Sequence, residues 1–268
     1  MSSNGDEGFE LFSSTRYDPA LVNASWKPSS DEPHCPFLLL SFHLDRLQEA
    51  VRHFQWKDDI GIATGDPNIY RYIREQAEET VSKEENGSGT KPLRVRLVLS
   101  SRTGFRIECF PTVERPYDLL FLSTFQSTNT NPLPSSPFPK PTKVYLDTEP
   151  TPSSDFTSYK TTRRDHYNAA RQRVGLTPST VDGEVILFDE EGQITEGSTR
   201  NIALWRDARW VSPVGGGLKG VVRRWLLEQG RVVEGTIRKE DAKTGEIVLL
   251  TNGVEGCTLG IITDGKYE

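Results

Sequence analysis

Residues 193–224 read QITEGSTRNIALWRDARWVSPVGGGLKGVVRR and hold two features from which the rest of the chain can be interpreted. A carboxylate, Glu196, follows an apolar strand and a turn. Further on, the glycine run Gly215–Gly217 leads into LKGVVRRWLLEQG, whose apolar spacing predicts a helix that ends at Gly230. Such a turn presents backbone N–H groups and the positive end of a helix dipole, which suits an anion such as phosphate. The alternative is that the glycines only make a tight turn.

Composition excludes several classes of protein. The net charge of −6 over 268 residues argues against a dedicated binder of nucleic acid or of anionic membranes. Three widely spaced cysteines, Cys35, Cys109 and Cys257, fit neither a disulfide framework nor a zinc pattern. The four histidines form no metal-binding pair, so no metal is expected. The N-terminus has no secretory signal and no apolar run reaches transmembrane length, so a cytoplasmic protein is expected.

The length suits one large domain or two modest ones. Residues 123–142 carry five of the seventeen prolines and few large apolar side chains, which is typical of a linker. We therefore expect a small N-terminal α+β domain at 1–122, a proline-rich linker at 123–142 and a larger C-terminal domain at 143–268.

Hydrophobic periodicity predicts elements on both sides of this linker. Before it we expect a strand at 9–17, helices from His43 and at 68–82, a hairpin formed by 93–101 and 103–111, and a strand at 117–122. After it we expect a strand at 143–147, a helix at 162–174 and strands at 184–188, 201–206 and 246–252. The segment GIITDGKY near the C-terminus is expected to be a β-hairpin tip.

We expect neither a nucleotide-binding protein nor a serine hydrolase, because we interpret the sequence as having no GxGxxG run after a strand, no Walker-type motif and no GxSxG. What remains is a lysine, Lys160, the carboxylate of Glu196, the helix start at Gly220–Val222 and the hydroxyl of Thr251. A pyridoxal phosphate enzyme needs these chemical parts. An amine condenses with the cofactor aldehyde, a carboxylate tunes the pyridine nitrogen, and a helix start with hydroxyl and arginine contacts holds the phosphate.

At this point the chain resembles the fold-type IV pyridoxal-phosphate family, the class-IV aminotransferase and lyase group. The matching pieces occur in the family's order over roughly residues 10–260; they are HLDRL (43–47), YKTTRRDHYNAAR (159–171), ITEGSTRNIAL (194–204), LKGVVR (218–223) and LLTN (249–252). The resemblance implies a two-domain α+β fold like that of D-amino acid aminotransferase, with pyridoxal 5'-phosphate in the interdomain cleft. It also implies a homodimer.

The resemblance assigns a role to individual residues. Lys160 is implied to be the Schiff-base lysine and proton shuttle, with a pKa lowered by burial and by cationic neighbours. Glu196 is implied to pair with the pyridinium nitrogen, supported by Asn201. The implied phosphate contacts are the side chain of Arg46, the backbone N–H groups at Gly220, Val221 and Val222, and the hydroxyl of Thr251.

The same resemblance narrows the reaction. Branched-chain aminotransferases carry a tyrosine five residues after the lysine, where this chain has Asp165, whereas 4-amino-4-deoxychorismate lyases carry an arginine four residues after it, where Arg164 stands. The chain looks most like the fungal-type lyases, which release pyruvate and make p-aminobenzoate for folate. The two carboxylates of that small-molecule substrate give Arg16, Arg96 and Arg164 groups to bind, and Asn252 is a further substrate-binding candidate.

Two alternatives remain. A class-IV transaminase acting on a D-amino acid, a branched-chain amino acid or an (R)-amine would share Lys160, Glu196 and the phosphate contacts. It differs in its second half-reaction, because it leaves the cofactor in the amine form and not as the aldehyde. The other alternative is a non-catalytic module that keeps the fold and takes up no cofactor.

Overall fold

The computed structural model describes residues 8–24, 31, 33–56, 66, 68–84, 90–115 and 140–267. The chain divides into two compact units, one formed by Met1–Glu114 with Tyr159–Arg163 and the other by Arg115–Ser158 with Arg164–Glu268. The segment that contains Lys160 therefore belongs to the first unit, although it lies far along the sequence. The strand expected at 117–122 and the linker expected from 123 onward, up to residue 139, lie outside the described residues.

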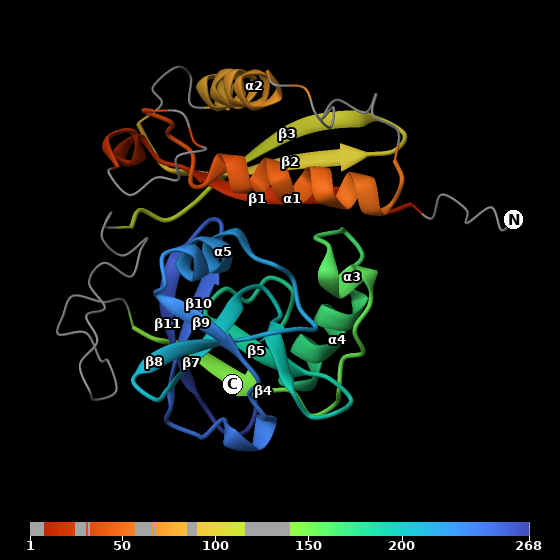
Figure 1. The fold of residues 1–268 in the computed structure, drawn as a ribbon, viewed down its shortest axis with the longest axis vertical. Helices are drawn as coiled ribbons and strands as arrows, with labels where there is room; N and C mark the ends of the chain where they lie inside the picture. Colours follow the sequence, from red (N-terminus) through yellow and green to blue (C-terminus); the bar gives the residue numbers. More distant parts are fainter. Residues whose placement is uncertain are drawn as a thin grey trace, which may run out of the picture. The chain divides into compact units, whose positions relative to one another are not determined.

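The first unit is a three-stranded antiparallel sheet with two helices (Figure 1). Its strands follow one another in the order β1 (Leu11–Tyr17), β2 (Leu93–Ser100) and β3 (Gly104–Pro111). Helix α1 (Leu40–His53) packs against β1, and helix α2 (Ile69–Glu84) packs against β3. The short 3-10 helix η1 (Pro19–Asn23) follows β1.

The two faces of this sheet differ in chemistry. Val95, Leu97 and Leu99 of β2 are fully buried in one core with apolar residues of both helices. Each such aliphatic side chain stabilises the fold by about 1.5–3 kcal/mol. Because successive strand residues point to opposite faces, Arg94 and Arg96 lie on the other face. The sheet thus has one apolar face against the helices and one face that carries guanidinium groups.

The second unit is built on an eight-stranded sheet in the order β6-β5-β4-β11-β10-β7-β8-β9. The strands are β4 (Thr142–Leu146), β5 (Gly183–Phe188), β6 (Ile194–Gly197), β7 (Asn201–Arg206), β8 (Arg209–Pro213), β9 (Val232–Gly235), β10 (Ile247–Asn252) and β11 (Gly256–Ile262). The pairs β4–β5, β4–β11 and β8–β9 are parallel, and the other pairs are antiparallel.

Helices cover parts of this sheet, and the apolar residues of the unit gather in two cores. Helix α4 (Asp165–Arg173) packs on β5, and the 3-10 helix η5 (Lys239–Asp241) and the short helix α3 (Asp155–Ser158) lie in connections. Tyr167 and Ala170 of α4 are buried with Val185 and Leu187 of β5. Helix α5 (Val221–Glu228) packs on β9 and β10. A second core gathers Ile202, Val248 and Leu250 from the middle of the sheet. The placement of α4 and α5 matters most for the site.

The structure confirms the α+β class and most of the expected elements, among them the hairpin of β2 and β3. Two expectations were wrong. The helix expected from residue 162 begins only at Asp165, because Thr161 and Thr162 pair with the start of β1 instead. GIITDGKY is not a hairpin tip: residues 260–262 end β11, and the β10–β11 turn lies before Gly256. No helix in the described ranges has the length and apolarity needed to cross a membrane.

Candidate active site

Glu196 lies in β6 of the second unit, with only 4% of its surface exposed. A buried carboxylate is costly unless it accepts hydrogen bonds. Tyr167, which α4 presents toward β6, donates its hydroxyl to Oε1 of Glu196 at 2.5 Å. Burial and the adjacent Glu196 charge raise the pKa of Tyr167 well above its usual value, so the phenol stays a donor. Sequence reasoning missed Tyr167 because its apolar spacing indicated only a core position.

The glycine run packs directly on the end of β6. Gly216 has a φ of +80°, and a Cβ there would lie 2.4 Å from the methyl carbon of Thr195. A Cβ at Gly217 would lie 2.9 Å from the Cβ of Glu196. Contacts below 3.0 Å require something to move. The glycines therefore allow the backbone to pass close to Glu196. They do more than form a tight turn, because larger residues there would clash with β6.

The same run corrects one expectation from the sequence. Gly215, Gly217 and Gly220 have the GxGxxG spacing, and they connect β8 to α5 in a βαβ unit, since β8 and β9 pair in parallel. The expectation that no such run follows a strand was therefore wrong. In a dinucleotide site these glycines let a pyrophosphate approach. Here, side chains of the protein itself occupy the space beside Gly217 and Gly220.

The N-terminus of α5 has the features of an anion site. Its N-cap residue, Gly220, makes no side-chain capping hydrogen bond. Asn201 donates its amide to the backbone oxygen of Leu218 at 2.7 Å, and a Cβ at Gly220 would lie 1.8 Å from Oδ1 of Asn201. The side chains of Val221 and Val222 are buried, so these residues offer only backbone groups. Asn201 thus fixes the loop that leads into the helix.

Thr251 belongs to the same end of the second unit. It is buried in β10 and lies opposite Asn201 of β7 in the antiparallel register. Since α5 packs against β10, the sheet brings together the predicted contacts Asn201, Gly220 and Thr251. The glycine run joins them to Glu196. The second unit therefore contains the buried carboxylate of Glu196 and, joined to it by the glycine run, the N-terminus of α5 without a side-chain cap.

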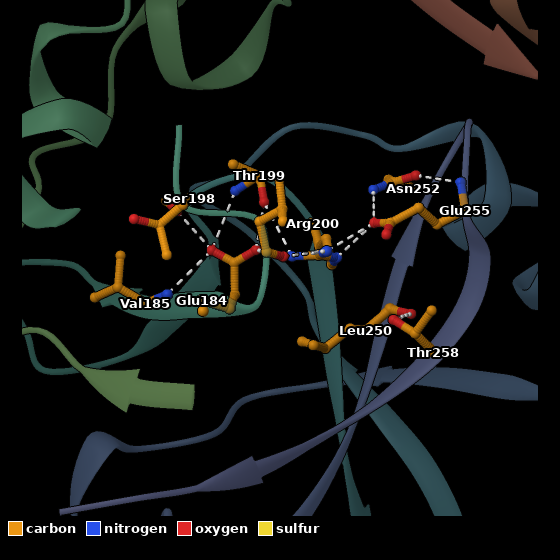
Figure 2. A network of polar contacts seen from close by, with 12 residues as sticks. Glu184, Val185, Ser198, Thr199, Arg200, Leu250, Asn252, Glu255 and Thr258 are labelled. Carbon is orange, nitrogen blue, oxygen red and sulfur yellow. Dashed lines mark hydrogen bonds and ion pairs between the residues drawn. The ribbon is translucent and has the colours of Figure 1, made fainter. Parts of the chain in front are cut away.

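Arg164 contacts the turn that follows Glu196, and Asn252 follows Thr251 at the end of β10. Arg164 donates Nη2 to the backbone oxygen of Ser198 at 2.6 Å, and its guanidinium carbon lies 4.5 Å from the ring centroid of Tyr167. Asn252 accepts hydrogen bonds from the backbone N–H groups of Val254 and Glu255 at 2.9 and 2.7 Å. Arg164 is therefore anchored beside the Tyr167–Glu196 pair, and Asn252 caps the β10–β11 turn (Figure 2).

In the first unit, Lys160 runs alongside the start of β1. Its backbone oxygen accepts a hydrogen bond from the Phe12 N–H at 3.0 Å, and its Nζ lies 5.0 Å from the Phe12 ring centroid. Arg46 of α1 reaches the next residue of β1, donating Nη2 to Oγ of Ser13 at 2.6 Å. Burial lowers the pKa of Arg46 to about 10, so it remains a cation at neutral pH. Neighbouring residues of β1, Phe12 and Ser13, thus contact the side chains of Lys160 and Arg46.

His43 completes a buried cluster with Ser13 and Arg46. Oγ of Ser13 lies 2.7 Å from Nδ1 of His43. This oxygen accepts from Arg46, and its hydroxyl hydrogen is available for Nδ1 in the His43 tautomer that carries its proton on Nε2. Burial, with the charges of Arg46 and Lys160, lowers the pKa of His43 well below its usual value. In the described part of the chain, Nε2 of His43 and Nε of Arg46 have no hydrogen-bond partner.

Sequence reasoning missed His43 and Ser13, although the signal was present. His43 precedes Arg46 by one helical turn, so both side chains share a face of α1. Ser13 is a polar residue at a buried position of a short strand. No spacing rule connects the strand to the helix, so the cluster becomes visible only in the fold.

Arg16 and Arg96 lie on the sheet face away from the helices. Arg16 is fully buried, donates Nε to Asp18 at 2.8 Å and Nη1 to the Val113 oxygen at 3.0 Å. Arg96 pairs with Glu108 at 3.1 Å and stacks on Phe12 at 4.6 Å. Among the described residues, Nη2 of Arg16 and Nε of Arg96 have no hydrogen-bond partner. Both arginines therefore place a guanidinium group on this face of the sheet.

Comparison with known proteins identifies relatives over most of the chain. The model of the family described as "Amino-transferase class IV" matches residues 30–259. The chain is similar to the aminodeoxychorismate lyase of Saccharomyces cerevisiae, 35% identical over 136 residues, which cover 44% of this chain and only 36% of that protein. It is similar to the "Putative aminodeoxychorismate lyase" of Schizosaccharomyces pombe, 26% identical over 266 residues, which cover 96% of this chain and 90% of that protein.

A solved structure shares the fold. It is a "Putative amino-acid aminotransferase" from Mesorhizobium loti, 23% identical, with a TM-score of 0.64 over 95% of this chain and 100% of that one. At this level of identity the likeness concerns the fold alone. Relatives with lyase names and a structural neighbour with an aminotransferase name share the architecture, so the choice between the two reactions rests on the residues of the site.

Proposed function

The chain belongs to the aminotransferase class IV family, and from this premise we propose that it is a pyridoxal-phosphate-dependent 4-amino-4-deoxychorismate lyase. It releases pyruvate and forms p-aminobenzoate. The observation that carries the cofactor assignment is the buried Glu196, held by Tyr167 at 2.5 Å and joined by the glycine run to the uncapped start of α5. The names of the two fungal relatives support the lyase reaction, and so do Arg164 at the lyase arginine position and Asp165 in place of the transaminase tyrosine.

The residues fit pyridoxal 5'-phosphate by chemistry. A buried carboxylate suits a protonated ring nitrogen, and α5 offers backbone N–H groups with the dipole end that a phosphate prefers. Arg46 has a buried Nε without a partner in the described part of the chain, which suits a phosphate oxygen. We propose that Glu196 and Asn201 serve the ring, and that Arg46, Gly220, Val221, Val222 and Thr251 serve the phosphate.

When bound, the cofactor supplies an aldehyde that bonds to amines and a ring that accepts electrons. Lys160 uses Nζ to take the proton from the amine-bearing carbon of the substrate and returns it to the enolpyruvyl group. Glu196, oriented by the hydrogen bond from Tyr167, would accept a hydrogen bond from the ring nitrogen. The guanidinium groups of Arg16, Arg96 and Arg164, with the amide of Asn252, orient the substrate through its carboxylates.

The proposal extends to the state of the protein in the cell. We propose a cytoplasmic homodimer that acts on a small molecule and on neither nucleic acid nor membranes. The odd number of dispersed cysteines supports the cytoplasmic location, and the net charge of −6 supports the absence of nucleic-acid and membrane binding. The homodimer follows from the family. Sedimentation equilibrium of the purified protein measures the dimer, and a monomer at all concentrations would contradict that part of the proposal.

Lys160→Ala tests the proposal directly. We expect the variant to lose the visible absorbance of the lysine-bound cofactor and the release of pyruvate from aminodeoxychorismate, because no other amine takes over both tasks. Lys143→Ala is the matched control, since Lys143 is an exposed lysine of β4. It should keep both signals. Retention of both signals by Lys160→Ala would show that the lysine has been assigned wrongly.

The second half-reaction distinguishes a transaminase from a lyase. Incubation with D-amino acids, branched-chain amino acids or (R)-amines would convert the cofactor of a transaminase to its amine form, with a matching loss of visible absorbance. A lyase keeps the aldehyde form and releases pyruvate and p-aminobenzoate in equal amounts. A colourless protein that takes up no cofactor would instead favour the non-catalytic module.

A further inference from the structure

One carboxylate of the second unit holds the turn that follows Glu196. Glu184 of β5 is fully buried, and its side chain reaches the turn between β6 and β7 (Figure 2). Its oxygens accept hydrogen bonds from the N–H groups of Val185 (3.0 Å) and Thr199 (3.2 Å), the hydroxyls of Ser198 and Thr199 (2.5 Å each) and Nη1 of Arg200 (3.1 Å). The turn is therefore bound through both its backbone and its side chains.

A second carboxylate holds the turn that follows Thr251. Glu255 lies between β10 and β11 and accepts Nε of Arg200 at 2.8 Å. Asn252 donates to the same oxygen at 2.8 Å, and Arg115 donates to the other oxygen at 3.0 Å. Burial raises the pKa of Glu255, but the charges of Arg200 and Arg115 outweigh it and leave the pKa lowered. Glu255 is thus an anion in the folded protein at neutral pH.

Arg200 pairs with both of these carboxylates. Its side chain is 7% exposed, so water does not replace either contact. It immediately precedes Asn201, which starts β7 opposite Thr251. One guanidinium therefore bridges the turn after Glu196 and the turn after Thr251, which Figure 2 shows as a continuous line of contacts.

We propose that Arg200, bridging Glu184 and Glu255, is a positioning residue that fixes Glu196 and Thr251 relative to each other. The inference rests on the proposed function, because Glu196 and Thr251 serve opposite ends of the cofactor there. A planar guanidinium presents several donors in fixed directions, so it sets a distance between two carboxylates that a flexible ammonium does not set. Without this bridge each turn relaxes separately, and one cofactor no longer satisfies both ends.

Arg200→Met tests this role, with Arg206→Met as the matched control. Arg200 immediately precedes β7, whereas Arg206 is its last residue and pairs with Glu246, so each variant removes a buried or part-buried arginine–glutamate pair at one end of this strand. Pyridoxal phosphate affinity is measured by equilibrium dialysis, and the visible absorbance of the bound cofactor is titrated against pH. We expect Arg200→Met to weaken the affinity by about tenfold or more and to shift the titration midpoint. Arg206→Met should change neither.

Two further variants test the role of the guanidinium group and guard against a failure of Arg200→Met to fold. Arg200→Lys should recover part of the affinity, since an ammonium reaches one carboxylate at a time. If Arg200→Met does not fold, a triple change with Glu184→Gln and Glu255→Gln removes the uncompensated charges, and its affinity should still fall by about tenfold. Equal affinity and equal titration in the Arg200 and Arg206 variants would overturn the inference. A wild-type protein that binds no pyridoxal phosphate would instead overturn the proposed function.

Discussion

Tyr167 and Glu196 show how a single hydrogen bond can define a chemical role. The phenol donates at 2.5 Å to a carboxylate that is 4% exposed, and α4 holds the ring of Tyr167 in its core. The sequence predicted Glu196 from its motif, but it offered no sign of the donor. Tyr167 was recognisable only as an inward residue, because a tyrosine on an apolar helix face is usually a core residue.

Tyr167→Phe should impair activity. The change removes a donor from a buried carboxylate, which costs about 1–3 kcal/mol, and a loss of about 1.4 kcal/mol from the transition state lowers kcat/KM about tenfold. Steady-state release of pyruvate measures this change. Tyr267→Phe is the matched control, because Tyr267 donates to Asp182 at 2.7 Å in an exposed position. Equal kcat/KM for the two variants would contradict a special role of Tyr167.

At the scale of elements, the loop between β8 and α5 combines three tasks. It crosses Glu196 through Gly217, it is held by Asn201 at Leu218, and it delivers an uncapped helix start. The sequence predicted the helix and its anion-binding end from periodicity and glycines. It did not reveal that the glycines make room for Glu196 and Asn201, because those contacts come from strands that the sequence places earlier.

Gly220→Ala should weaken binding of pyridoxal phosphate. The added Cβ would lie 1.8 Å from Oδ1 of Asn201, so either the amide or the helix start has to move. Overpacking of this kind costs about 1–3 kcal/mol, which corresponds to about tenfold in affinity. Gly215→Ala is the control, since a Cβ at Gly215 meets no atom within 4 Å. Equilibrium dialysis compares the two, and equal affinities would contradict the tight fit at Gly220.

Across the whole molecule, the sequence predicted the helices and strands that follow from local patterns. It did not predict contacts between residues that are far apart in the chain. The strands, α1, α2 and α5 follow from periodicity and turn residues. The start of α4 was misplaced because Thr161 and Thr162 pair with β1, about 150 positions earlier in the chain. The Ser13–His43–Arg46 cluster and the bridge made by Arg200 were missed for the same reason.

His43 should make the stability of the protein depend on pH. Its pKa is lowered in the folded state by burial and by Arg46 and Lys160, whereas the unfolded chain protonates it near the ordinary value of about 6.5. The unfolded state therefore binds more protons below about pH 6.5. The free energy of unfolding should fall by up to about 1.4 kcal/mol per pH unit as the pH decreases further, and His43 should contribute no slope above that value.

Urea denaturation of the protein from about pH 5 to about pH 8 measures this slope. His43→Asn keeps an acceptor for Ser13 and should flatten the decline below about pH 6.5. His53→Asn is the control, because His53 is an exposed residue at the end of the same helix. An unchanged decline in His43→Asn would show that other groups cause it.

The pairing of Thr161 and Thr162 with Glu10 and Leu11 also orders events during synthesis. The ribosome releases β1 long before it releases the segment 159–163, so the first unit waits for its last hydrogen-bonded piece while the intervening chain emerges. A fragment that stops at Glu114 holds three strands and two helices, yet it lacks the piece that carries Lys160. Lys160 therefore reaches its position beside β1 only after the ribosome has released the chain beyond residue 163.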